Sequence, residues 1–414
     1  MEQVKLGIIG VGNMGSAHAT KIAVDGKCPE IKLVAIADIS EKRRQWAKEN
    51  LPGDVEIFDD AIKMLDSGLL DACVVAVPHY FHPKYVIECL NRGIHVLSEK
   101  PAGVYTKQVE EMNAVAAEHP ETIFALMFNQ RTNHIYRKMR ELVQSGKYGQ
   151  IRRTNWLVTN WYRPQAYYDS GDWRATWAGE GGGVLLNQCP HQLDLWQWIC
   201  GMPTKVQAHL SFGKWHDIEV EDDVTCYVEY ANGATGAFIT STGDPHGTNR
   251  FEVQMDRAQI IAEGGKLKVF ELDMAEPEFS KTCESPFGHP QATEIEVETD
   301  GLNLQHVGVL NAFAAAILGH GELVAQGVEG INGLTISNAM HLSAWLNKEI
   351  VLPIDADLYY DELKKRIATS RKKENVVERE VNMDSTYSGT ADGAKKKIMD
   401  EANGVTRDRW NTNW

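Results

Sequence analysis

Three glycines near the N-terminus have the spacing of a dinucleotide-binding fingerprint. The segment GVGNMG at residues 10–15 follows a short apolar run at 4–9 and opens a stretch with helical spacing. In this strand, turn and helix context, Gly10 makes the tight turn and Gly12 lets the backbone approach a pyrophosphate, while Gly15 allows close helix packing. The helix N-terminus then faces the phosphates. The pattern predicts a dinucleotide site.

An acidic residue ends the second predicted strand, 23 positions after the third glycine: Asp38. Its carboxylate would accept hydrogen bonds from the adenosine ribose hydroxyls and repel a 2′-phosphate. Arg43 and Arg44 on the next predicted helix are the counterargument, because a guanidinium there could favour NADP, although both are also ordinary solvated helix residues. The sequence favours NAD over NADP, with Asn13, Met14 and Arg43 among the expected cofactor contacts.

Three further segments extend this pattern, at residues 74–82 (VVAVPHYFH), 93–101 (GIHVLSEKP) and 181–194 (GGGVLLNQCPHQLD). With the fingerprint, they resemble the Gfo/Idh/MocA family of glucose-fructose oxidoreductases and inositol dehydrogenases. The resemblance runs from about residue 4 to about residue 355. It implies a Rossmann domain over 1–130 and a substrate-binding and oligomerisation domain over 131–355, assembled as a homodimer or homotetramer.

The resemblance also implies roles for individual residues. Lys100, in the EKP tripeptide, is expected to face the nicotinamide and the substrate, while Glu99 and Pro101 shape the cofactor cleft. The same resemblance places further side chains at the cofactor, namely Pro78, His79, His82, Trp173 and Arg174. From the residues alone, a packed ring beside a surface guanidinium is the less favoured alternative for the Trp-Arg pair.

Oxidation of a secondary alcohol needs a base for the hydroxyl proton and a cation near the developing alkoxide. We assign His191 as the base and Lys100 as the cation, with the proton flow reversed for reduction. Asn187, His191 and Asp194 have the spacing of one helix face if a helix begins near Asn187, and Pro190 fits its first turn. The positive helix end would keep the imidazole neutral.

The substrate side departs from the family pattern. Many relatives carry Asp where this chain has Asn187, and an amide can hold a hydroxyl but cannot accept its proton. Aromatic residues cluster between 156 and 177, where Trp161 and Arg163 are the expected substrate contacts because they share a predicted strand face. The acidic run at 217–223 is interpreted as a solvated strand end, so no metal site is predicted.

Hydrophobic periodicity predicts an α/β protein with two sheets. Strands are expected at 4–9, 32–37, 72–77, 95–97 and 123–128, with helices between them at 41–49, 83–91 and 107–118. Such alternation indicates a parallel Rossmann sheet. After a helix near 136–144, alternating segments at 153–162, 206–212, 224–230, 234–241, 251–255 and 258–262 indicate a large, mostly antiparallel open sheet. Helices at 193–199, 306–318 and 334–346 are assigned to this second half.

The C-terminal region is distinct in composition. Pro353 is expected to end the compact fold, and residues 356–414 form a charged extension with a Lys/Arg/Glu-rich run at 364–380 and a Gly/Ser/Thr patch at 385–393. Two interpretations fit this composition: a solvated tail with fraying helices, or an arm that packs on a neighbouring subunit.

Bulk composition excludes several classes of protein. The net charge of -15 and the absence of a basic stripe before residue 360 argue against nucleic-acid binding. Seven scattered cysteines without a CxxC pair indicate buried thiols in a reducing compartment. With no signal peptide and no run of about 20 apolar residues, we expect a cytoplasmic protein without membrane contact.

The combined prediction is an NAD-dependent oxidoreductase that moves a hydride between the nicotinamide and a secondary hydroxyl of a sugar, glycoside or inositol. Two alternatives stay open. One is redox-neutral chemistry, in which a held cofactor oxidises a sugar to a keto intermediate that then undergoes elimination or epimerisation. The other is a nucleotide sensor that has lost catalysis, whose expected mark would be loss of Lys100 or His191; both are present.

Overall fold

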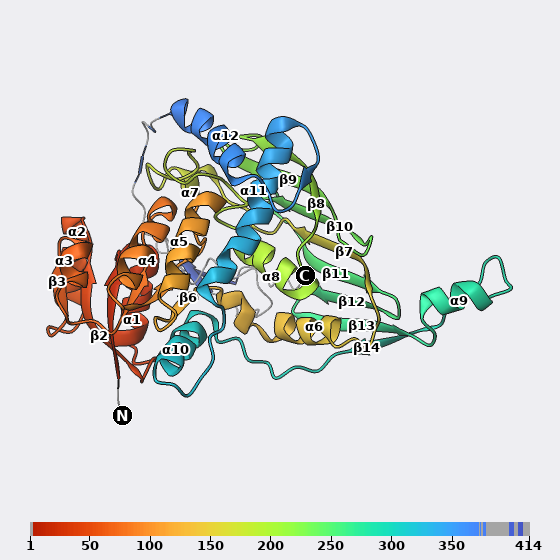
Figure 1. Cartoon of the computed structure of the whole chain (residues 1–414), viewed down its shortest axis with the longest axis horizontal. Helices are drawn as coiled ribbons and strands as arrows, with labels where there is room; N and C mark the ends of the chain where they lie inside the picture. Colours follow the sequence, from red (N-terminus) through yellow and green to blue (C-terminus); the bar gives the residue numbers. More distant parts are fainter. Residues whose placement is uncertain (1–2, 372, 374–375, 378–396, 401–404, 409–414) are drawn as a thin grey trace.

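A parallel six-stranded sheet forms the N-terminal half of the protein (Figure 1). The computed structural model describes residues 3–371, 373, 376–377, 397–400 and 405–408. In spatial order the strands are β3 (Glu56–Phe58), β2 (Ile31–Ala37), β1 (Val4–Ile9), β4 (Ala72–Val75), β5 (His95–Ser98) and β6 (Phe124–Leu126). All neighbouring pairs are parallel, and the order 3-2-1-4-5-6 is that of a Rossmann fold. The predicted parallel sheet is confirmed.

Helices cover both faces of this sheet, which explains why its strands are continuous apolar runs. Successive side chains point to opposite faces, so Val74 packs in one core and Val75 in the other. One face is covered by α1 (Asn13–Ala23) and α2 (Glu41–Asn50), the other by α3 (Ala61–Leu65), α4 (His82–Leu90) and α5 (Thr106–Glu118).

A helix from the C-terminal half completes the first of these faces. In α10 (Gln305–Ile317), Leu310 and Phe313 are buried in the same core as Leu6 and Ile8 of β1. Figure 1 shows α10 beside α1. The helix predicted at 306–318 exists, but its assignment to the second sheet was wrong, because its apolar face is buried against the Rossmann sheet.

The second sheet has nine strands. In spatial order they are β14 (Ala292–Glu296), β13 (Lys266–Leu272), β12 (Ala258–Glu263), β11 (Asn249–Met255), β7 (Ile151–Val158), β10 (Thr235–Ser241), β9 (Glu221–Glu229), β8 (Lys205–Phe212) and β15 (Ile350–Val351). Only β7 and β10 pair in parallel, so the predicted mostly antiparallel sheet is confirmed. Four strands of the two sheets were not predicted: β3, β13, β14 and β15.

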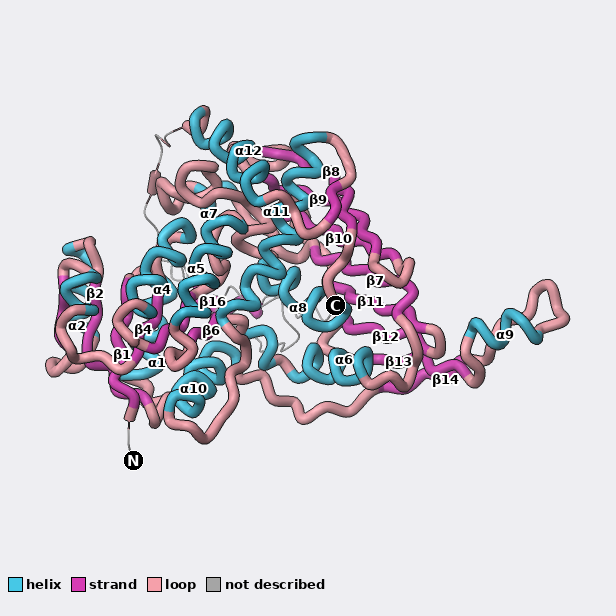
Figure 2. Tube along the Cα trace, in the orientation of Figure 1, coloured by secondary structure: helices cyan, strands magenta, loops and turns pink. Residues whose placement is uncertain are grey.

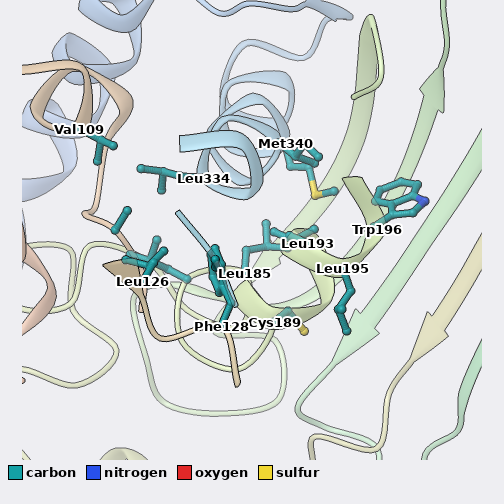
Figure 3. Packing of buried hydrophobic residues seen from close by; sticks show 14 of the residues in the cluster. Val109, Leu126, Phe128, Leu185, Cys189, Leu193, Leu195, Trp196, Leu334 and Met340 are labelled. Carbon is teal, nitrogen blue, oxygen red and sulfur yellow. The ribbon is translucent and has the colours of Figure 1, made fainter. Parts of the chain in front are cut away.

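Three helices lie between the two sheets: α6 (His134–Gln144), α8 (Pro190–Cys200) and α11 (Gly330–Leu346). Figure 2 shows them as the middle layer, and α9 (Glu276–Thr282) projecting beyond the sheet edge. Around α8, Leu193 and Trp196 are buried together with Met340 of α11 (Figure 3). Since the N-terminus of α8 carries His191, this packing holds the predicted base in place.

The compact fold continues beyond Pro353. Helix α12 (Ala356–Ala368) packs on α5 and α11, and its Tyr359 and Leu363 are fully buried. The expectation that the compact fold ends at residue 353 was therefore wrong, because Tyr359 and Leu363 are part of the larger hydrophobic core. Of the rest of the extension, β16 (Lys397–Asp400) pairs with β17 (Val405–Asp408), and the patch at 385–393 lies outside the described residues.

Short elements complete the description, namely α7 (Gln165–Tyr168) and the 3-10 turns η1 (His79–Phe81), η2 (Asn129–Thr132) and η3 (Gly327–Glu329). All seven cysteines lie in the described part and are free thiols, of which Cys200 and Cys283 are only half-buried. Within the described residues, no helix has the length and apolarity to cross a membrane, and no cluster of His, Cys, Asp or Glu could hold a metal ion.

Candidate active site

The carboxyl ends of β1, β4 and β5 are adjacent in the sheet, so the three loops that follow them meet at one edge. Gly10 has a φ of +87°, and a Cβ there would lie 2.5 Å from the carbonyl oxygen of Ala76. A Cβ on Gly15 would lie 1.8 Å from the Gly10 oxygen. A Cβ on Gly12 would meet no atom within 4 Å. Two glycines are thus required by the protein's own packing, and the third borders open space.

That open space fits a pyrophosphate. Gly12 is the N-cap of α1 and gives the helix no side-chain cap, so the first amides, including those of Asn13 and Met14, need an outside acceptor. A helix N-terminus with free amides and no side chain in front of it favours an anionic oxygen. The loop therefore fits the diphosphate of NAD.

Asp38 is oriented by the backbone around it. Its two carboxylate oxygens accept hydrogen bonds from the amides of Val11 and Ser40, each at 2.8 Å. Each oxygen keeps a lone pair for a ribose hydroxyl. The Arg44 guanidinium donates to the Asp38 carbonyl oxygen at 2.8 Å, so it is held on the backbone there. Arg43, in the first turn of α2, stays a prediction as a cofactor contact.

Glu99 directly follows β5 and is a buried, ionised carboxylate. Burial alone would raise its pKa, but the His18 ring nitrogen at 2.7 Å, and the nearby charges of His306 and Lys100, bring that pKa down to about 2. Burial, followed by the His18 charge, lowers the pKa of His306 to about 3. The His18 and His306 rings lie 5.5 Å apart. Neither histidine was among the predicted site residues; His18 belongs to α1 and His306 to α10.

Lys100 reaches across from the Rossmann half to the second half. Its Nζ donates to the Asn187 carbonyl oxygen at 2.9 Å. Burial lowers its pKa, against the opposing charges of Glu99 and Glu180, which raise it. The ammonium is thus held at a defined position in the cleft, next to the segment that leads into α8.

His191 lies in the first turn of α8 and is only 3% exposed. Neither ring nitrogen has a hydrogen-bond partner among the described residues. Burial, and then the Lys100 charge, lower its pKa well below 6.5, so the imidazole is neutral. The Phe128 ring supports it edge-on, with centroids 6.2 Å apart. A neutral, buried imidazole without a partner is chemically suited to take a proton from a bound hydroxyl.

The predicted single helix face of Asn187, His191 and Asp194 was wrong. Helix α8 begins at Pro190, because proline fits its first turn, and Asn187 lies in the preceding turns. Asp194 is paired with Arg131, which donates to both of its oxygens at 2.7 and 2.8 Å. Asp194 therefore anchors helix α8. Asn187 belongs to the turn that precedes this helix.

The residues predicted after β4 divide into two groups. Pro78 precedes η1 directly, and the His79 ring lies edge-on to Trp173, with centroids 5.7 Å apart. His82 has both ring nitrogens within 2.7 Å of carbonyl oxygens, those of Val77 and Pro101. It has no nitrogen left for a cofactor, and instead holds the loops after β4 and β5 together.

Trp161 and Arg163 lie in the loop after β7, not on a strand, since β7 ends at Val158. They still contact each other, with the guanidinium carbon 5.4 Å from the indole centroid. Arg163 and Arg174 also lie over the Tyr167 ring, at 5.2 and 4.7 Å. The buried Trp161 Nε1 has no partner among the described residues. A donor of this kind is available to a ligand.

The acidic run at 217–223 is not a solvated strand end. Glu221 is fully buried, and its carboxylate accepts hydrogen bonds from the amides of Gly183 and Leu185 at 2.9–3.0 Å. Asp222, also fully buried, accepts from the amides of the turn at 214–216. Glu221 thereby fixes the turn that carries Asn187, a role that strand alternation could not indicate.

The segment after α12 closes one side of this region. The Lys373 Nζ donates to the Tyr168 carbonyl oxygen at 2.6 Å, and the Val377 amide donates to the Asp169 oxygen at 3.0 Å. Ser370 donates to Glu219 at 2.6 Å. Ser370, Lys373 and Val377 therefore lie along the loop at 168–178 of their own chain.

The fold and the site define a dinucleotide-binding oxidoreductase. The model of the GFO/IDH/MocA oxidoreductase family's NAD-binding Rossmann fold matches residues 4–126, and that of the GFO/IDH/MocA C-terminal domain matches residues 136–261. The chain belongs to this family.

Three relatives illustrate the similarity. The chain is 26% identical to a 1-carboxy-3-chloro-3,4-dihydroxycyclohexa-1,5-diene dehydrogenase of Comamonas testosteroni over 59% of each protein. It is 24% identical to the myo-inositol 2-dehydrogenase of Thermotoga maritima over 63% of this chain and 75% of that enzyme. The WlbA dehydrogenase of Chromobacterium violaceum, solved with NADH and UDP-GlcNAcA, has the same fold, with a TM-score of 0.73, 24% identity, and coverage of 86% and 97% of the two chains.

Proposed function

We propose that this protein is an NAD-dependent dehydrogenase that oxidises a secondary hydroxyl of a sugar, glycoside or cyclitol. The observation that carries the proposal is the neutral, buried imidazole of His191, which has no partner among the described residues and lies close enough to Lys100 for that charge to lower its pKa. A base and a cation at one cleft edge suit the removal of a hydroxyl proton.

Different residues bind the substrate hydroxyl, accept its proton and hold the cofactor. Lys100, held by the Asn187 carbonyl oxygen, orients the substrate hydroxyl and stabilises negative charge on its oxygen. His191 accepts the hydroxyl proton during oxidation and returns it during reduction. Bound NAD supplies the hydride acceptor. The fingerprint loop and Asp38 hold the adenosine and diphosphate portions, with Glu99 and Pro101 shaping the cleft.

Two features support a polyhydroxylated substrate. Trp161 offers a flat ring and an unpartnered indole donor, and Arg163 packs over it with further donors. Flat rings beside polar groups suit the C–H faces and hydroxyls of a pyranose or cyclitol. The relatives named as acting on myo-inositol or solved with a nucleotide sugar are consistent with this class.

The direct test is to add NAD and a panel of inositols, sugars and glycosides to the purified protein and follow absorbance near 340 nm. We expect NADH formation with at least one member, and its loss in Lys100→Ala and His191→Ala. A folded, NAD-loaded sample that forms neither NADH nor altered sugar would refute the dehydrogenase. Product analysis in the same samples detects the redox-neutral alternative as epimerised or cleaved sugar without net NADH.

We also propose that the protein forms a homodimer or homotetramer through the outer face of the nine-stranded sheet. On that face Leu157 is 37% exposed and Tyr227 is 43% exposed, although both are on central strands. Apolar side chains in such a position are typical of a subunit interface. Light scattering of the purified protein tests this directly, and a monomer would contradict it.

A further inference from the structure

A buried carboxylate, Glu180, lies behind Asn187 and was not among the predicted site residues. It directly precedes the three glycines of the segment at 181–194 and is 2% exposed. One of its oxygens accepts a hydrogen bond from the Asn187 side-chain amide, and the other accepts from the Ala175 amide at 2.6 Å. Arg174 lies 3.9 Å away. A buried carboxylate with three such neighbours is fully engaged on its own side of the cleft.

The contact with Glu180 decides which way the Asn187 amide faces. A carboxylate only accepts hydrogen bonds, so the amide must present its NH₂ group to Glu180. The Asn187 Oδ1 is then the atom left for a ligand. Because Lys100 is held by the backbone oxygen of the same residue, a bound hydroxyl would meet an ammonium and an amide oxygen in a fixed arrangement.

Glu180 also contributes charge to the site. Burial raises the pKa of Glu180, against the Arg174 charge and the hydrogen bonds from Ala175 and Asn187, which lower it. The negative charge of Glu180 in turn raises the pKa of Lys100 and so favours its ammonium form. In this chain position 187 is an amide, and the carboxylate is that of Glu180, which contacts the side chain of Asn187. A second carboxylate at 187 would be in direct contact with Glu180 and would raise the pKa of one of the two.

We propose that Glu180 is a positioning residue that orients Asn187 and supplies the negative charge behind it, so that positions 180 and 187 work as a pair in which one member is charged and the other is an amide. This inference rests on the proposed function, because the pair positions the substrate hydroxyl for Lys100 and His191. Exchanging the two side-chain types should therefore preserve the pair, whereas changing either one alone should break it.

The experiment is a charge-exchange cycle with Glu180→Gln, Asn187→Asp and the double variant. We expect Glu180→Gln to lower kcat by about 10-fold, because the amide loses its fixed acceptor. Asn187→Asp should lose activity as pH rises, because two ionised carboxylates then repel each other. The double variant should recover to within about 3-fold of the original protein and lose that alkaline decline.

The control is Asp169→Asn, a half-buried acid of the same loop whose carboxylate binds Gln165 at 3.0 Å. It should match the original protein in kcat and pH profile. If the fold-loss in kcat of the double variant equals the product of the fold-losses of the two single variants, the two positions act independently and the pairing is overturned. So would a Glu180→Gln variant that unfolds at lower temperature but keeps the original kcat and pH profile, since that is the signature of a purely structural role.

Failure of the proposed function would be distinguishable from failure of the pairing. If the original protein turns over no substrate, the pair is still tested by thermal unfolding of the four proteins near pH 5 and near pH 8. We expect Asn187→Asp alone to lose stability on going to the higher pH, because a raised folded-state pKa gives stability that is lost as pH rises. The double variant should not. Equal pH dependence in both would refute the pairing independently of activity.

Discussion

The nucleotide half and the catalytic half of the cleft are built in different ways. In the nucleotide half, backbone amides and one carboxylate from residues 10–38 form the site; Gly10 and Gly15 allow close packing of the chain, and Gly12 leaves the space in front of the amides open. In the catalytic half, side chains act, and each depends on a buried partner from a distant segment: Lys100 on the turn at Asn187, and that turn on Glu221. A site formed by backbone groups depends on one short segment of sequence. A site formed by side chains also depends on the distant buried residues that hold those side chains in position.

The largest expected effect separates the two halves directly. His191→Ala should lower kcat by about 10²- to 10⁴-fold, the usual contribution of a general base, and leave NAD binding unchanged. Steady-state rates and a titration of NAD by fluorescence measure the two effects. A comparable loss of NAD affinity would mean that the halves are not separable at this residue.

Removal of the Glu221 carboxylate should have the next largest effect. Glu221→Ala removes the acceptor of two buried amides, those of Gly183 and Leu185, and should cost about 3 kcal/mol of the free energy of unfolding. It should also lower kcat, because the turn that carries Asn187 loses its restraint. Urea unfolding and kinetics on the folded variant measure both. A wild-type kcat in a destabilised protein would show that the turn holds its shape without the carboxylate.

Two glycine variants sharpen the contrast within the nucleotide half. In Gly15→Ala the new Cβ would lie 1.8 Å from the Gly10 oxygen, so the helix must move, at a cost of about 1–3 kcal/mol in stability. In Gly12→Ala the Cβ meets nothing within 4 Å, so stability should change by less than about 0.5 kcal/mol while NAD binding weakens. Melting temperatures and NAD titrations distinguish the two. Equal destabilisation would contradict the open space at Gly12.

The smallest expected effect concerns pH. Burial and the Lys100 charge lower the His191 pKa well below 6.5, so the base stays neutral until the pH is far below that value. For oxidation, kcat/KM should therefore stay level as pH falls through 6.5, and decline only at lower pH, where protonation removes the base. An acid limb centred near 6.5 would instead indicate a histidine in an ordinary, solvated environment.

Sequence reasoning worked best where the chemistry and its position share one short segment. The fingerprint, Asp38 and the loops after β4 and β5 all come directly after apolar runs, and parallel strands bring their carboxyl ends together by geometry alone. It was less reliable where burial decides the role. Glu221 and Asp222 have the sequence spacing of a solvated strand, and nothing in that spacing indicates that amides from Gly183 and Leu185 would cover one of them.

Helix α8 illustrates how one boundary changes three assignments. The sequence predicts Pro190 in the first turn of a helix, and a shared face for Asn187, His191 and Asp194 if that helix begins near Asn187. The observed start at Pro190 leaves Asn187 outside the helix, and Asp194 is paired with Arg131. Helix ends depend on capping and on what the flanking turn contacts, and here Glu221 holds that turn from another strand.

The sequence by itself determined the two-sheet architecture and the nucleotide loop, because hydrophobic period and glycine placement act over a few neighbouring residues, and its motifs carried the resemblance to the family. Only the tertiary structure decided that α10 covers the Rossmann sheet, that α12 belongs to the core, and that Glu180 and Glu221 stand behind Asn187. These are contacts between segments far apart in the chain, and the free energy that selects them comes from burial of matched apolar and hydrogen-bonding groups, which no local pattern records.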